Sequence, residues 1–284
     1  MKTSLELVSL GVALIVVCGT QALAQTEPGN KKAPTSKLYL SETKGPGHIY
    51  TGGKIFEPKQ ATAFDAPGTI IETETDAHQA YVYSNGTGMF VDANTRVEVN
   101  RFVQEPFQAD RNTTETEPSV SQSDIFIWHG LVGVCTSQLV SGSTMTYTTA
   151  HAAITIRGRK IAILTSSKET IVYLLDGDVT VRTSGKDLGG QVLKTGERAI
   201  IRPGAAGQPP VVNIGPIEPD QVNKLDDKVT LACNARRTVS FETIERKAEF
   251  GATGQEGNPP EEIVPRPTVS QTPNVNIVVS PSQL

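Results

Sequence analysis

The sequence is poor in cysteine, in aromatic residues and in positive charge. Its 284 residues include three Cys and one Trp, and aromatic residues make up 5% of the chain. So few cysteines exclude a small fold held together by several disulfides. Lys and Arg number 26 against 30 Asp and Glu. Since a nucleic-acid-binding domain normally carries a basic surface, this balance argues against a nucleic-acid partner.

The sequence also lacks an apolar run long enough to cross a membrane as a helix. The longest run, residues 7–19, is shorter than the roughly 20 residues that a spanning helix needs. It follows a basic start and precedes Ala22 and Ala24, which have the spacing of a signal peptidase site. We therefore predict a signal peptide over residues 1–24, cleaved before Gln25. The mature protein is then exported, periplasmic or secreted, and has no transmembrane anchor; an uncleaved anchor is the alternative.

Cleavage leaves two cysteines, Cys135 and Cys233. In an oxidising compartment these two residues can form one intramolecular bridge. The alternative is two buried free thiols, which we favour slightly on sequence alone, because spacing does not show whether the two sulfur atoms lie within bonding reach.

Residues 38–203 show the period-two pattern of β-strands. Apolar and polar residues alternate, or β-branched residues cluster, and Gly-containing turn signals separate these segments. The clearest such segments are residues 80–84, 96–100, 154–157, 171–175 and 178–182. Strands spaced about ten residues apart predict an all-β domain, with many short antiparallel strands in a twisted sandwich or solenoid-like unit.

The regions on either side of this domain have a different composition. Residues 25–37 form a polar leader, and residues 204–219 indicate an extended linker. Residues 220–284 form a Pro-rich tail, with one late strand at 275–279. A short amphipathic helix is expected near the start of the tail, because four apolar residues recur there at helical spacing. These residues are Val222, Leu225, Val229 and Cys233.

The sequence contains no motif that predicts catalysis. It has no nucleophile elbow, no His-Glu-x-x-His and no pair of His or Cys residues at metal-ligand spacing. We therefore predict a protein that is not an enzyme, with no catalytic residue, no metal site and no cofactor. A carbohydrate-active enzyme with carboxylates from separate strands is the alternative, and its candidates are Glu72, Glu74 and Asp176.

Six segments occur in the order found in a known family. They are 68–73 (GTIIET), 80–87 (AYVYSNGT), 91–99 (VDANTRVEV), 149–158 (TAHAAITIRG), 175–181 (LDGDVTV) and 193–199 (LKTGERA). In this order they resemble the strands and turns of the FecR-type periplasmic domain. The resemblance covers about residues 65–203 and implies a β scaffold.

Most residues that carry the resemblance are turn or core residues. The turn residues are Gly86, Gly158, Asp176, Gly177 and Gly196. Gly86, Gly177 and Gly196 stand where hairpins need a positive φ. The valines of the motifs, Val97, Val99, Val179 and Val181, are expected to face the core. Arg157 is the one matching charged residue with a candidate role beyond structure.

The resemblance implies a non-enzymatic binding or signalling module in the bacterial envelope. Its partner would be an envelope protein or a polysaccharide. The alternative that the resemblance offers is a component of surface signalling for iron or nutrient uptake.

Overall fold

In a computed structural model, the chain is described for residues 35–107, 115–183, 189–205, 208–240 and 268–269. These residues belong to one compact unit, Lys31–Leu284. The expected signal peptide, with Ala22, Ala24 and Gln25, lies outside the described residues, and so does the strand expected at 275–279.

The strands form two layers that share one long strand. In order, the first layer contains β4 (Thr62–Asp65), β1 (Lys37–Lys44), β6 (His78–Tyr83), β7 (Gly88–Val91), β9 (Ser121–Cys135), β12 (Lys160–Thr165), β13 (Thr170–Asp176), β16 (Glu197–Arg202) and β17 (Val211–Pro216). The second contains β3 (Lys54–Phe56), β2 (Gly47–Thr51), β5 (Ile70–Thr73), β8 (Thr95–Gln104), β9, β10 (Thr144–Thr148), β11 (Ala152–Ile156), β14 (Val179–Thr183) and β15 (Gln191–Leu193). We call the first layer the covered sheet and the second the exposed sheet.

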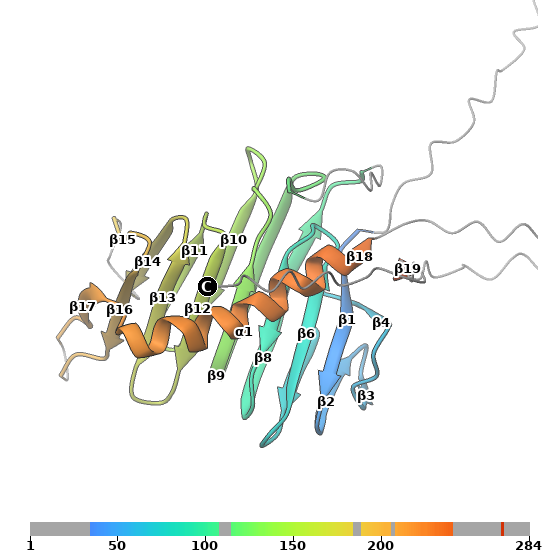
Figure 1. Cartoon of the computed structure of the whole chain (residues 1–284), viewed down its shortest axis with the longest axis horizontal. Coiled ribbons are helices and arrows are strands. Elements are labelled where there is room, and N and C mark those ends of the chain that lie inside the picture. The colour runs from blue at the N-terminus through green and yellow to red at the C-terminus, as the bar shows by residue number, and fades with distance from the viewer. Residues whose placement is uncertain (1–34, 108–114, 184–188, 206–207, 241–267, 270–284) are drawn as a thin grey trace, which may run out of the picture. The chain divides into compact units, whose positions relative to one another are not determined.

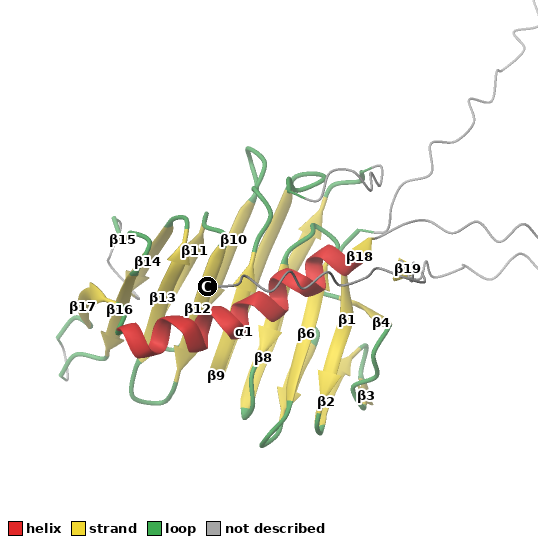
Figure 2. Ribbon diagram, in the orientation of Figure 1, coloured by secondary structure: helices red, strands yellow, loops and turns green. Residues whose placement is uncertain are grey.

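Neighbouring strands in both sheets are antiparallel, except that β9 and β10 run parallel. Among the described residues one helix accompanies the strands, as Figure 2 shows. The predicted all-β class, with many mostly antiparallel strands, is confirmed.

Strand β9 passes from the exposed sheet to the covered sheet. Its first part pairs with β8 and β10, and its second part, from Gly130 onward, pairs with β7 and β12. Gly130 has a φ of 97°, a conformation that residues with a side chain rarely adopt. A Cβ atom at this position would lie 2.6 Å from the Cα atom of Thr95. Glycine is therefore required at this corner on two independent grounds.

The main core lies between the two sheets. Side chains on one face of each strand point inward, because successive residues of a strand alternate between its two faces. The four valines expected to face the core, Val97, Val99, Val179 and Val181, are at most 1% exposed, which confirms that prediction.

Helix α1 (Pro219–Thr238) covers the outer face of the covered sheet. It begins with a proline in its first turn, where the missing N–H group has no cost. Figure 1 shows α1 crossing the strands from β12 to β1. Leu225, Val229 and Cys233 are buried against this face, whereas Val222 is 36% exposed. The amphipathic helix expected from the sequence is therefore present, although Val222 does not contribute to its buried face.

A disulfide and a close backbone approach are among the contacts that hold α1 close to the sheet. Cys233 forms a disulfide with Cys135 at the end of β9, with 5.1 Å between their Cα atoms. The sequence left open a bridge or two buried free thiols, and the structure contains the bridge. Gly88 of β7 lies directly under the helix, and a Cβ atom there would come 2.0 Å from the carbonyl oxygen of Ala232. The helix backbone can approach so closely only because residue 88 has no side chain.

The segment predicted as an extended linker, residues 204–219, contains a strand that the sequence does not predict. Val211–Pro216 forms strand β17, which pairs along its length with β16. β17 is an edge strand with mostly exposed residues, so it lacks the alternation of apolar residues that would reveal it in the sequence. Within the tail, a further short pair joins β18 (Val239–Ser240) to β19 (Thr268–Val269).

In the described part of the chain, no helix combines the length and the apolar content needed to cross a membrane.

Candidate functional site

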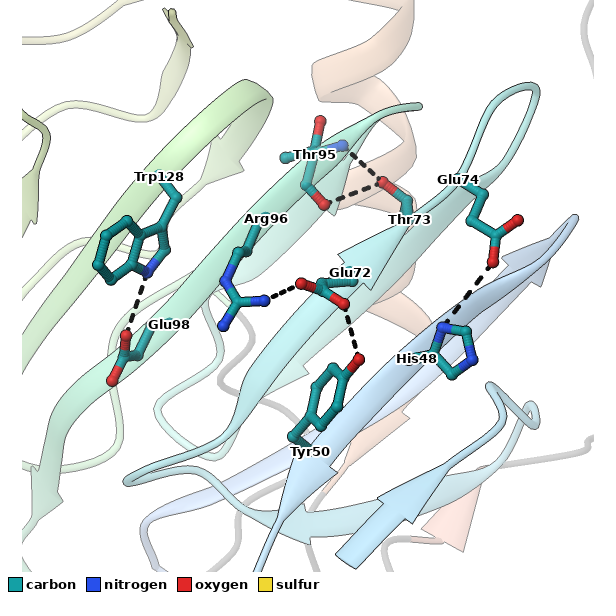
Figure 3. Close-up of polar contacts among 9 residues, drawn as sticks. All are labelled: His48, Tyr50, Glu72, Thr73, Glu74, Thr95, Arg96, Glu98 and Trp128. Atoms are coloured by element: carbon teal, nitrogen blue, oxygen red, sulfur yellow. Dashed lines mark hydrogen bonds and ion pairs between the residues drawn. The ribbon is translucent and has the colours of Figure 1, made fainter. Parts of the chain in front are cut away.

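The outer face of the exposed sheet carries a cluster of aromatic and charged side chains. Among described residues, α1 packs against the covered sheet, and this cluster remains partly or fully exposed. We call it the Trp128 face. Its members are His48, Tyr50, Glu72, Glu74, Arg96, Glu98, Phe126 and Trp128, most of which are drawn in Figure 3.

Strand alternation places these side chains on one face. In β9, Ile125 and Ile127 are fully buried in the core, so Phe126 and Trp128 point outward. The pairing of strands then brings the members together across the sheet. Glu72 is opposite Arg96, and Phe126 is opposite Glu98 on the neighbouring strand.

A β-bulge sets the position of Trp128. Arg96 pairs with His129, but the next residue, Val97, pairs with Ile127. Trp128 is therefore an extra residue in β9 opposite β8, and such bulges re-aim the side chain they carry. The bulge lies two residues before the corner at Gly130. Trp128 is 52% exposed, which is unusual for the largest apolar side chain.

The exposed indole ring of Trp128 is held by three neighbours. Its Nε1–H donates a hydrogen bond to Glu98 Oε2 at 3.1 Å. Phe126 packs against it nearly edge-on, with ring centroids 4.8 Å apart and an angle of 67°. The guanidinium carbon of Arg96 lies over the ring, 6.0 Å from the centroid. The ring is thus fixed in orientation although half of its surface faces solvent.

Glu72 connects the centre of the face to its far edge. Arg96 donates to one of its carboxylate oxygens, and the hydroxyl group of Tyr50 donates to the other at 2.8 Å. Beyond Tyr50, His48 Nδ1 lies 3.8 Å from Glu74 Oε1. Figure 3 shows a hydrogen-bonded row from Tyr50 on β2 through Glu72 on β5 to Arg96 on β8, with the His48–Glu74 pair as a separate contact beside it. Charge-assisted hydrogen bonds of this kind fix side chains in defined geometry.

The carboxylates proposed as alternative catalytic groups are not brought together. Glu72 and Glu74 lie on the Trp128 face, where Glu72 already accepts hydrogen bonds on both oxygens. Asp176 ends β13, which belongs to the covered sheet. The three carboxylates therefore do not form one site.

A pocket of about 610 Å³ lies at a second place, beside the loop that follows β9. It is lined by residues 137–143 and by Arg157 and Arg159. Arg159 Nη2 donates to Glu115 Oε2 at 2.8 Å. The guanidinium group of Arg157 is exposed and makes no hydrogen bond or ion pair with a described residue. Arg157 thus offers a positive charge at the rim of this pocket.

The two turn motifs around Arg157 and Asp176 pack against each other. The N–H groups of Arg157 and Arg159 donate to the backbone oxygens of Asp178 and Asp176 at 3.0 and 2.9 Å. A Cβ atom on Gly177, which has a φ of 98°, would come 2.3 Å from the Cα atom of Gly158. Gly158 and Gly177 are therefore needed for close backbone approach.

The other turn glycines named in the sequence have the conformation expected of them. Gly86, between β6 and β7, has a φ of 82°, and Gly196, before β16, has a φ of 86°. Neither belongs to the Trp128 face. Within the described ranges, no group of three or more His, Cys, Asp or Glu side chains is arranged to hold a metal ion.

The sequence reasoning missed the Trp128 face. A usable signal was present, because Ile125 and Ile127 alternate with Phe126 and Trp128, and this places both aromatic residues on one face of a strand. The partners on β2, β5 and β8 depend on strand register, which a single sequence does not show.

No family model matches the chain, and no curated protein matches it. Two crystal structures of a candidate anti-sigma factor from Parabacteroides distasonis ATCC 8503, at 1.65 and 2.50 Å resolution, are similar to part of it. Each is 13% identical to this chain, with a TM-score of 0.39. The similarity covers 54% of this chain and 62% of that chain, which is less than two thirds of its length.

Proposed function

We propose that the protein is an exported, non-enzymatic, FecR-like module that binds a partner in the bacterial envelope through the Trp128 face. The order of the six sequence segments supports the family, and the apolar run before Ala24 supports export. Gly158 and Gly177 belong to two of these segments, 149–158 and 175–181. Their close backbone packing explains why both segments need a glycine there.

A single observation carries the binding role: the only tryptophan of the chain is 52% exposed and yet held in place. An exposed indole ring has a large apolar surface that is stabilised when a ligand covers it. Because Glu98 and Phe126 already fix its orientation, binding costs little side-chain entropy. Fixed aromatic residues surrounded by polar groups are the usual centres of binding surfaces.

This proposal predicts that Trp128→Ala weakens binding at least about tenfold while leaving the fold intact. The lost stacking surface has this effect because one central aromatic residue commonly contributes more than about 1.4 kcal/mol of binding free energy. The measurement is co-sedimentation of the mature protein with an insoluble bacterial envelope fraction, over a range of protein concentrations. Circular dichroism of the variant checks the fold.

Val192→Ala is the matched control. Val192 is an apolar residue on the outer face of the same sheet, 62% exposed, but it lies on β15, away from the Trp128 face. Binding equal to that of the unchanged protein is expected for it. Equal loss in both variants would show non-specific adhesion, and undiminished binding of Trp128→Ala would reject the Trp128 face as the binding surface.

A further inference from the structure

The geometry of the Trp128 face points to the chemical class of its ligand: we infer that it binds a polysaccharide without negative charge, with one sugar ring stacked on Trp128. This inference rests on the proposed function, because it names the ligand of the same face.

The indole ring meets the first requirement of sugar recognition. One face of a pyranose ring presents several C–H groups, and these form a flat apolar patch that packs on an aromatic ring. Trp128 offers half of its surface to solvent in a fixed orientation. Phe126 stands beside it at a centroid distance of 4.8 Å and widens the apolar area on the same strand.

The groups around the ring meet the second requirement, which is to bind hydroxyl groups. Glu98 and Glu72 provide carboxylate acceptors on either side of Arg96, whose guanidinium group provides planar donors. Each Glu72 oxygen already accepts one hydrogen bond, and a carboxylate oxygen can accept a second. Neighbouring hydroxyl groups of a sugar match such carboxylate and guanidinium geometries, in which two parallel hydrogen bonds form at once. These side chains are already held in place, Glu72 by Arg96 and Glu98 by Trp128.

The length of the face fits a chain of sugars. Its members lie on four adjacent strands, β2, β5, β8 and β9. Neighbouring strands lie about 4.8 Å apart, so the face extends about 14 Å across the sheet. This length accommodates more than one sugar residue, and a polymer can continue past both edges of the face.

Charge decides which polysaccharides fit. Three carboxylates, from Glu72, Glu74 and Glu98, stand against the single guanidinium group of Arg96. A negatively charged polymer would meet repulsion from this surplus, because like charges brought together cost free energy. A neutral polysaccharide supplies hydroxyl donors to the same carboxylates. Electrostatic complementarity therefore favours a neutral polysaccharide over nucleic acids and polymers of sugar acids.

The test is affinity electrophoresis of the mature protein in gels that contain defined soluble polysaccharides. The probes are three neutral polymers, namely a β-1,3-glucan, a β-1,4-glucan derivative and a galactomannan, together with the negatively charged polygalacturonate. We expect at least one neutral polymer to retard the protein, and polygalacturonate to retard it less. For the neutral polymer that binds, Trp128→Ala should weaken binding at least about tenfold, and Glu98→Gln should weaken it by a smaller factor because Trp128 loses a charged hydrogen-bond partner. Val192→Ala should migrate as the unchanged protein does.

The outcomes separate this inference from the proposed function. If no neutral polymer retards the protein, or if polygalacturonate retards it most, the polysaccharide inference is wrong. The proposed function then still stands if Trp128→Ala loses co-sedimentation with the envelope fraction, since a protein, or a charged polymer if polygalacturonate retards the protein most, would then be the partner at this face. If that co-sedimentation does not depend on Trp128, the proposed function fails as well.

Discussion

Replacing both bridging cysteines, as Cys135→Ala/Cys233→Ala, is expected to lower the free energy of unfolding by about 4 kcal/mol. The disulfide joins residues 98 positions apart. Closing a loop of that size contributes about 4.7 kcal/mol in the entropic treatment, whereas disulfides typically contribute about 2–4 kcal/mol, so we expect a value between these. The bridge also ties α1 to the end of β9, where Cys135 and Cys233 are both buried. Urea unfolding of the oxidised protein and of the double variant measures the difference.

The same proteins locate the effect within the fold. Hydrogen exchange should become faster first in α1 when the bridge is lost, because the helix is then held without a covalent link, by packing and by ion pairs such as Lys228–Asp92 and Lys160–Asp226. Exchange in β8 and β14 should change less. A stability difference below about 1 kcal/mol, or uniform exchange throughout, would contradict the role given to the bridge.

Gly130→Ala is expected to be the most damaging glycine-to-alanine substitution in the exposed sheet, at about 3 kcal/mol or more. Two costs add at this position. A φ of 97° is unfavourable for alanine, and the added Cβ atom would lie within 2.6 Å of the Cα atom of Thr95, which only backbone movement can relieve. Thermal and urea unfolding measure the loss.

Gly196→Ala separates these two costs. Gly196 also has a positive φ, of 86°, but a Cβ atom there would contact nothing within 4 Å. The control should therefore lose only about 1 kcal/mol, from backbone strain alone. Equal losses at the two positions would mean that the corner of β9 can relax, and that its tight packing on Thr95 contributes nothing.

The sequence predicts local structure well where the burial of each residue depends only on its near neighbours in the chain. Alternating Val97 and Val99, and likewise Val179 and Val181, predict inward-facing strand residues, and these four side chains are buried. The spacing of Leu225, Val229 and Cys233 predicts a helix with one buried face, which the fold provides. In each case neighbours in the sequence are also neighbours in the element, so the period alone suffices.

Features that depend on distant segments are not visible in this way. In the first part of β9, buried residues such as Ile125 and Ile127 alternate with more exposed ones. In its last part, from Leu131 to Cys135, every residue is buried. In the fold, this change marks the passage from a sheet with one wet face to a sheet covered on both faces. The sequence shows the change of pattern, but not that one strand belongs to two sheets. The disulfide is also invisible in the sequence. Its two sulfur atoms are within bonding distance only because α1 lies across the covered sheet.

The candidate site depends most strongly on placement of distant segments. Trp128 is exposed because of a bulge against β8 and a corner at Gly130. Its partner Arg96 reaches Glu72 only because β5 and β8 pair in one register. A shift of one residue would turn either side chain into the core. This explains why composition and motifs gave an expected fold class and no expected binding surface.

The most direct test of the Trp128 face uses the single tryptophan as a reporter. A ¹H–¹⁵N correlation spectrum of the mature protein should contain one indole Nε1–H signal, because the chain has one Trp. We predict that adding a neutral polysaccharide that retards the protein shifts or broadens this signal, together with the backbone amide signals of β8 and β9. Binding that leaves the indole signal unchanged, and that instead perturbs amides around Arg157 and residues 137–143, would contradict the assignment of the Trp128 face as the binding surface.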